Sequence, residues 1–211
     1  MTQEIEQIEY RQSSAVIKFT DEKQFEVNLE IPSKLKISSK QDIENELFER
    51  IIYESHKFEC EKKALQYIST RMKSELETIN YLKKKNFQSE IIEQVMNRLK
   101  ELNYINDHEF ACKFTDYKMR TKTIGLNLIK GELIQKGIKR EIIEEVLSPL
   151  KLLKRDDELL ELALKKFETV KLKKNPIEKV KMFLISRGFD FDEISSILKI
   201  ISSKLKSDDF E

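Results

Sequence analysis

The sequence predicts a mainly α-helical protein: three tandem three-helix repeats in an elongated array, preceded by a small N-terminal β-hairpin and helix. Three observations predict this fold class. Only four glycines and three prolines occur in 211 residues, so turn-forming positions are scarce. Apolar residues recur at helical spacing from about residue 60 onward. Within that part of the chain, one apolar pattern returns every 51 residues.

The N-terminal segment has strand periodicity instead. Apolar residues at 25, 27, 29 and 31 alternate with polar ones, which is typical of a half-buried strand. Residues 16–19 supply a partner strand across a turn at 20–23, and residues 5–10 a third strand. Pro32 closes the hairpin, and strands are expected only in the first 32 residues. Ser39 and Asp42 then open a helix with Ile43 and Leu47 on one face.

The repeat is visible when the segments from Leu82, Leu133 and Leu184 are aligned. The equivalent apolar positions that follow are Phe87, Ile138 and Phe189; Ile92, Ile143 and Ile194; Val95, Val146 and Ile197; and Met96, Leu147 and Leu198. Asn86, Gly137 and Gly188 occupy one column between helices, and these residue types tolerate the left-handed conformation that ends a helix.

Capping patterns divide each repeat into three helices. The predicted pairs of a capping residue and a carboxylate three residues later are Ser74–Glu77, Asn106–Glu109, Asn175–Glu178 and Asp190–Glu193. We expect helices near 61–70, 74–85 and 89–102; 107–121, 125–136 and 140–148; and 156–170, 176–187 and 191–205. The predicted domains are an N-terminal extension (1–59) and repeats at 60–105, 106–150 and 151–211.

The composition excludes several function classes. So little glycine disfavours a β-sandwich, a collagen-like chain or a Gly-rich phosphate-binding enzyme, and no Walker A loop is present. His56 and His108 are far apart, and Cys60 and Cys112 lack metal-site or disulfide spacing. We therefore predict a protein that is not an enzyme, without cofactor, metal or catalytic residues. Since no signal peptide or membrane span is recognisable, we expect a cytoplasmic monomer that does not bind membranes.

The net charge of +1 hides a local excess of positive charge. Residues 113–140 contain eight Lys or Arg but only Asp116 and Glu132 as acids. A solvated helix face and a partner-binding face both explain this cluster, and the imbalance favours binding. The candidate binding residues are Arg71, Lys73, Lys113, Lys118, Arg120, Lys122, Lys130, Lys136, Lys139 and Arg140. Phe110, Phe114 and Tyr117 are expected on the buried side of the same helix, and Lys171, Lys173 and Lys174 in a solvated linker.

Three ordered elements resemble the RecX regulatory proteins, the recombination regulators that act on the RecA recombinase. They are Arg71, Ser74, Glu75 and Glu77; Tyr104, Ile105, Asp107, Phe110 and Ala111; and Gly125, Glu132, Leu133, Lys136, Gly137 and Ile138. The resemblance covers most of residues 60–150. After Gly125, where the family usually has an arginine-rich stretch, this chain has Asn127 and Leu128.

The resemblance implies a protein that lies along a RecA nucleoprotein filament and inhibits ATP hydrolysis, strand exchange and filament extension, with a weak direct contact to DNA. Two other readings of the residues stay open. One is a helical-repeat DNA-binding protein, indicated by the basic middle of the chain. The other is a scaffold that recognises acidic protein surfaces.

Overall fold

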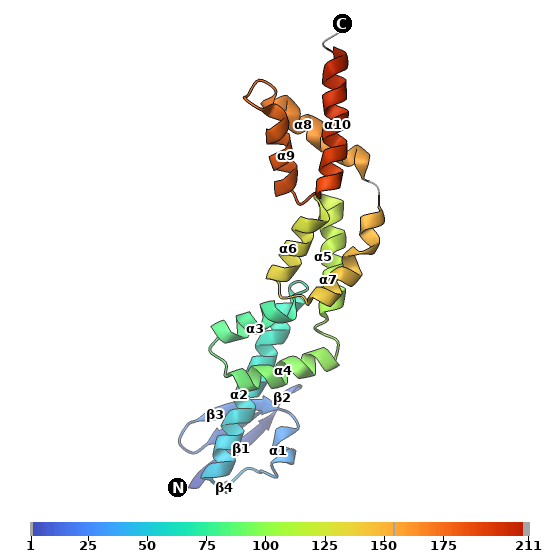
Figure 1. The fold of residues 1–211 in the computed structure, drawn as a ribbon. Coiled ribbons are helices and arrows are strands. Elements are labelled where there is room, and N and C mark those ends of the chain that lie inside the picture. Colours follow the sequence, from blue (N-terminus) through green and yellow to red (C-terminus); the bar gives the residue numbers. More distant parts are fainter. Residues whose placement is uncertain (1, 154, 209–211) are drawn as a thin grey trace. The chain divides into compact units, whose positions relative to one another are not determined.

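The computed structural model describes residues 2–153 and 155–208. The described chain divides between Ile105 and Asn106 into two compact units. Figure 1 shows strands at the N-terminal end only and helices in the rest of the described chain. Three-helix groups follow one another along the sequence, as the fold class predicted.

The first unit begins with a four-stranded antiparallel sheet. Its strands are β1 (Thr2–Tyr10), β2 (Ser14–Phe19), β3 (Gln24–Asn28) and β4 (Gln41–Glu44), in the order β3-β2-β1-β4. A short helix, α1 (Ile31–Lys34), connects β3 to β4. Helix α2 (Asn45–Ser69) packs its first turns on the sheet, where Phe48 meets the Phe19 ring edge-to-face at 5.0 Å. The helix thereby supplies the burial that an isolated hairpin lacks.

The restriction of strands to the first 32 residues was wrong. Residues 41–44 pair antiparallel with the start of β1, with Thr2 opposite Glu44 and Ile5 opposite Gln41. Buried Ile43 between exposed Asp42 and Glu44 fits a strand as well as a helix start, and pairing with β1 decides between them. Ser39 does not cap a helix; its hydroxyl accepts the Ile8 N–H at 3.0 Å.

The β3 strand also ends earlier than predicted. It stops at Asn28, so Leu29 is exposed and Ile31 begins α1. The helix expected at 61–70 is the last part of α2, because no glycine or proline interrupts residues 45–69. Helices α3 (Glu75–Lys84) and α4 (Ser89–Glu101) complete the first repeat around a core that includes Cys60, Leu82 and Leu99.

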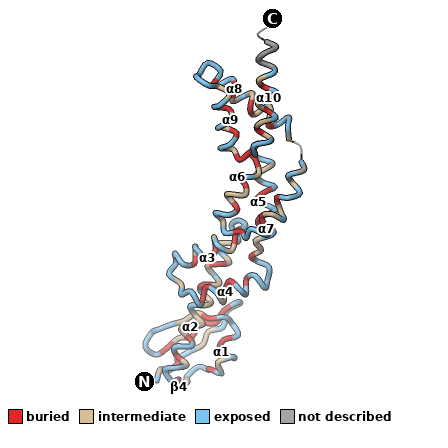
Figure 2. The backbone as a smooth tube through the Cα atoms, in the orientation of Figure 1, coloured by how far each residue is buried: buried red, intermediate tan, exposed pale blue. Residues whose placement is uncertain are grey.

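The second unit contains two three-helix groups. The first comprises α5 (Asp107–Thr121), α6 (Leu126–Gln135) and α7 (Arg140–Leu147), followed by the short 3₁₀ helix η1 (Pro149–Leu152). The second comprises α8 (Asp156–Val170), α9 (Pro176–Ser186) and α10 (Phe191–Asp208). Each group has its own hydrophobic core. Figure 2 shows that buried residues recur along α5, α6, α7, α8 and α9, between intermediate and exposed positions.

The aligned columns confirm the repeat. Leu82, Leu133 and Leu184 are each fully buried at the same place in their groups. The residues in the turn column have positive φ, 64° at Asn86, 79° at Gly137 and 82° at Gly188. The 51-residue period therefore marks one helix–turn–helix unit folded three times.

Three of the four predicted caps are present, at Ser74, Asn106 and Asp190. The prediction at Asn175 was wrong, because its side chain makes no capping hydrogen bond. Its backbone is left-handed, with φ 54° and ψ 59°, whereas a capping residue is normally extended. Pro176 starts α9 without that cap because its ring already fixes a helical φ.

Candidate partner-binding surface

The two candidate residues in the first unit have different environments. Arg71 is exposed in the loop between α2 and α3. Lys73 is 7% exposed, and its ammonium lies 4.3 Å from the centre of the Tyr67 ring. Tyr67 in turn stacks on Tyr81 at 4.1 Å, so Lys73 is part of the packing that holds this loop. Only Arg71 of this pair is exposed to solvent.

Lys118 does not belong to an exposed basic face, contrary to the prediction from helical spacing. Its side chain is 17% exposed, and its ammonium lies 2.5 Å from a Glu132 carboxylate oxygen. It also lies 5.1 Å from the centre of the Phe114 ring. Lys118 thus ties α5 to α6, because the ion pair and the ring contact both hold it against its own repeat.

Tyr117, unlike Lys118, is exposed on α5. The residue is 63% exposed, although we expected it beside Phe110 and Phe114 on the buried side of α5. Phe110 is buried and Phe114 half-buried, so the apolar stripe of α5 is narrower than its aromatic spacing indicated.

Lys113 and Arg120 lie on the solvent side of α5 in local ion pairs. Lys113 pairs with Glu109 at 2.6 Å and Arg120 with Asp116 at 2.9 Å, each one turn apart along the helix. Their side chains are 65% and 77% exposed. Exposed pairs at this spacing contribute only about 0.3–0.5 kcal/mol, so a partner can replace them easily.

Lys130 and Lys136 are half-buried, like Lys118. Lys130 forms a close hydrogen-bonded ion pair with Glu144 of α7, which lowers the pKa of that carboxyl. The Lys136 ammonium lies 5.5 Å from the ring centres of both Phe110 and Phe114. Both lysines connect helices of the second repeat.

Three candidate cations are fully presented to solvent. Lys122 ends α5, while Lys139 and Arg140 begin α7, and all three are exposed. Among the side chains that the structure describes, no carboxylate lies within ion-pair distance of these three. The exposed basic set is therefore Arg71 in the first unit and Lys113, Arg120, Lys122, Lys139 and Arg140 in the second.

Two family models match the helical part of the chain. The first RecX three-helix domain covers residues 60–99 and the second covers residues 106–147. A regulatory protein RecX from Clostridium beijerinckii is 30% identical over 210 residues, which cover 97% of each chain. This chain belongs to the RecX family. The RecX of Clostridium perfringens is 29% identical over 85% of each chain.

A RecX crystal structure has the same fold as this chain. It superposes with a TM-score of 0.79 over 95% of this chain and 99% of its own, at 21% identity. Residues 156–208, beyond the second matched RecX domain, form a third three-helix group of the same kind.

A tight joint between the second and third repeats was missed by the sequence analysis. The Gly125 N–H donates to the Arg187 carbonyl at 2.9 Å, and the Asn127 N–H donates to the Gly188 carbonyl at 3.1 Å. A Cβ on Gly125 would lie 2.1 Å from the Gly188 oxygen, so only glycine permits this approach. Arg155 adds a hydrogen bond to the Ile124 carbonyl at 3.1 Å.

Leu128 lies so close to the α9–α10 turn that a Cβ on Gly188 would be 2.2 Å from the Leu128 nitrogen. Both glycines were visible in the sequence, but no local signal shows that residues so far apart in the chain meet.

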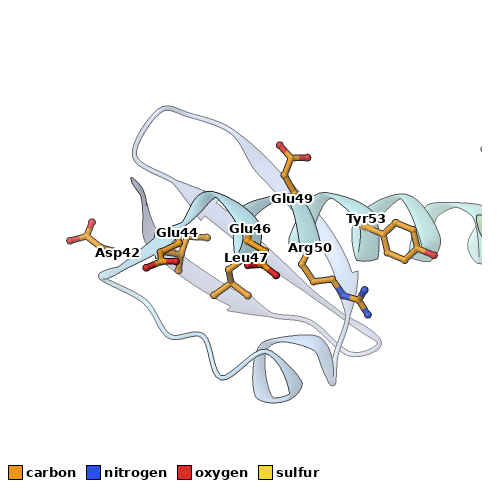
Figure 3. Close-up of a pocket in the computed structure, with 8 residues that line it drawn as sticks. Asp42, Glu44, Glu46, Leu47, Glu49, Arg50 and Tyr53 are labelled. Carbon is orange, nitrogen blue, oxygen red and sulfur yellow. The ribbon is translucent and has the colours of Figure 1, made fainter. Parts of the chain in front are cut away.

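The first unit also has a shallow pocket of ≈ 620 Å³ between β4 and the first turns of α2. Figure 3 shows that the Asp42 and Glu49 side chains there point in different directions, so the acids do not converge on one point. Arg50 is engaged with Glu54 at 3.2 Å and lies 5.4 Å from the centre of the Tyr53 ring. In the described part of the chain no cluster of His, Cys, Asp or Glu could hold a metal ion.

No helix among the described residues is both long enough and apolar enough to span a membrane.

Proposed function

We propose that this RecX-family protein is a negative modulator of the RecA recombinase, which binds the RecA filament on DNA and inhibits its ATPase, strand exchange and filament extension. Membership of a family of regulatory proteins supports the regulatory role. The motif resemblance described above supports RecA as the target.

One structural observation supports an anionic partner surface: Lys122, Lys139 and Arg140 are exposed cations that form no ion pair with a described side chain, although Arg140 lies near enough to Glu144 to lower the pKa of that carboxyl. Lys113 and Arg120 add two cations held only by weak helix-surface pairs. Such a field attracts negatively charged surfaces and makes association sensitive to salt. In this proposal the domains are residues 1–59, 60–105, 106–150 and 151–211. The contact is made by Arg71 in the second domain and by Lys113, Arg120, Lys122, Lys139 and Arg140 in the third.

The test is the ATPase rate of RecA on single-stranded DNA with increasing amounts of this protein. The wild-type chain is expected to lower the rate without any ATPase of its own. A triple variant, Lys122→Glu, Lys139→Glu and Arg140→Glu, should inhibit at least tenfold less well, since each exposed pair is worth up to about 1 kcal/mol.

The matched control reverses Lys83, Lys84 and Lys85, three exposed lysines at the end of α3. It should inhibit like the wild type. A RecA ATPase rate that stays unchanged over the whole wild-type titration would refute the proposal.

A direct contact with single-stranded DNA is a second candidate function, favoured by Tyr117. Its ring is 63% exposed on the same helix as Lys113 and Arg120, and stacking of bases on exposed aromatics beside cations is the usual mode of such binding. Tyr117→Ala should weaken binding of a labelled oligothymidylate by at least fivefold, about 1 kcal/mol. Equal binding by the variant and the wild type would exclude this contact.

A further inference from the structure

The joint between the second and third repeats defines a receiving surface on the second repeat. In the second repeat this receiving surface consists of Ile124, Gly125, Asn127 and Leu128, which accept the α9–α10 turn of the next repeat. One period later, the equivalent residues are Asn175, Pro176, Glu178 and Lys179. A groove of ≈ 880 Å³ opens over this part of the third repeat, where Asn175, Glu178 and Lys179 line it.

A second copy of this chain does not fit the groove in the way the joint is made. Pro176 replaces Gly125 and has no N–H to donate to an incoming carbonyl. Lys179 replaces Leu128, so the apolar contact under the turn is also lost. In every copy the Gly188 turn is already bound to its own Gly125.

The groove is strongly basic. Residues 171–181 include five lysines and one acid, Glu178. Glu178 pairs with Lys181 at 3.5 Å, and Lys171 pairs with Glu168 at 2.6 Å. Lys173, Lys174 and Lys179 line the groove, are exposed, and make no ion pair with any described side chain. Lys173 and Lys174 lie in the exposed turn between α8 and α9, where a solvated linker was predicted, and Lys179 lies near the start of α9.

The apolar side chains beside these lysines are open to a partner. Met182 lines the groove and is 56% exposed, and Leu172 in the adjoining turn is 96% exposed. The Phe183 ring, by contrast, has the charged ends of Lys166 and Arg187 each 5.1 Å from its centre. Because those two cations already lie against the Phe183 ring, a base stacks on it poorly. Exposed aliphatic groups framed by lysines fit a protein segment better than a nucleic acid.

We propose that the groove over Lys173, Lys174, Lys179 and Met182 is a docking site for an acidic segment of a partner protein that also carries an apolar side chain. The carboxylates of the segment pair with the lysines, and its apolar side chain covers Met182. This inference does not depend on RecA being the target.

The test measures binding of the full chain to two labelled probes by fluorescence anisotropy: a peptide of Glu, Leu and Ala, and an oligothymidylate of equal length. The variant Lys173→Glu, Lys174→Glu, Lys179→Glu should bind the peptide about tenfold less tightly. Met182→Ala should weaken peptide binding severalfold and leave oligothymidylate binding unchanged. The matched control Lys83→Glu, Lys84→Glu, Lys85→Glu should change peptide binding less than twofold.

Three results would overturn the proposal. The first is a wild-type chain that does not bind the peptide. The second is an equal loss of peptide binding in the control, which would show attraction by charge without a site. The third is loss of oligothymidylate binding in the lysine variant together with unaltered peptide binding by Met182→Ala, which would assign the groove to nucleic acid. Thermal melts of each variant establish that these results concern folded protein.

Discussion

Lysines with the same charge have different roles in this protein because their surroundings differ. Lys73, Lys118 and Lys136 each lie over an aromatic ring in their own repeat, whereas Lys122 and Lys139 extend into solvent. Long side chains can bury their methylene stems while the ammonium reaches a carboxylate or a ring. A lysine in the sequence therefore becomes a structural or a binding residue according to what lies within reach of its end.

Charge reversal separates the two kinds of lysine. Lys118→Glu should lower the free energy of unfolding by about 1–3 kcal/mol, because it places a carboxylate against Glu132 in a partly buried site. Lys122→Glu, at an exposed helix end, should change it by less than about 0.5 kcal/mol. Urea denaturation measures both. Equal stabilities would show that the contact between Lys118 and Glu132 is not formed in solution.

The two cysteines should differ in reactivity. Cys60 is fully buried in the first repeat, and burial raises the pKa of its thiol to about 12. Cys112 is exposed on α5. At pH 8 a thiol reagent should label Cys112 of the folded protein rapidly and Cys60 only after denaturant is added. The thiolate is the reactive form, and burial keeps the Cys60 thiol protonated. Mass spectrometry of the labelled peptides identifies the site, and rapid labelling of Cys60 would contradict its burial.

The same shift predicts a loss of stability in alkali. In the unfolded chain the pKa of the Cys60 thiol has its ordinary value of 9.0, whereas burial in the folded protein raises that pKa to about 12. Stability should therefore fall as the pH rises through this interval, because the unfolded state releases a proton that the folded state retains. Cys60→Ala should remove this contribution to the pH dependence.

At the scale of elements, each repeat depends on the turn between its second and third helices. The left-handed residue lets the third helix fold back on the second, and in the third repeat the same turn docks on its neighbour. Gly188 therefore ends a helix and also forms a joint. The left-handed conformation of Gly188 was predictable from the sequence, but its contact with Gly125 was not.

Alanine substitutions test the joint. Gly125→Ala should destabilise the second unit by about 1–3 kcal/mol, since the new methyl group would overlap backbone atoms that cannot move aside. Gly131→Ala is the matched control: nothing lies within 4 Å of its added Cβ, and it is inside α6. That control should stabilise the helix by up to about 1 kcal/mol. Differential scanning calorimetry compares the two, and a neutral Gly125→Ala would mean that the joint is open in solution.

At the scale of the whole molecule, the chain divides after Ile105 into two units with separate cores. The second unit contains two three-helix groups linked by the Gly125–Gly188 joint. A fragment of residues 106–211 should therefore fold alone and melt in one cooperative transition by circular dichroism. Two separate transitions would show that the joint does not couple the groups.

The sequence by itself determined the three-helix repeat, its 51-residue period, and nearly all helix bounds after residue 70. Helical periodicity, capping residues and left-handed turn residues are local signals, and each determines the structure of residues close to it in the sequence. Ile43 shows their limit, because its pattern fits helix and strand alike until β1 is present.

Only the tertiary structure decided which of the candidate cations are exposed. Lys118, Lys130 and Lys136 are held by Glu132, Glu144 and two Phe rings, partners that helical spacing along α5 or α6 does not reveal. The tertiary structure likewise decided that Gly125 meets Gly188 and that the lysines of the third repeat line one groove. Contacts between distant segments depend on how helices pack, and packing is specified jointly by all the side chains of a repeat.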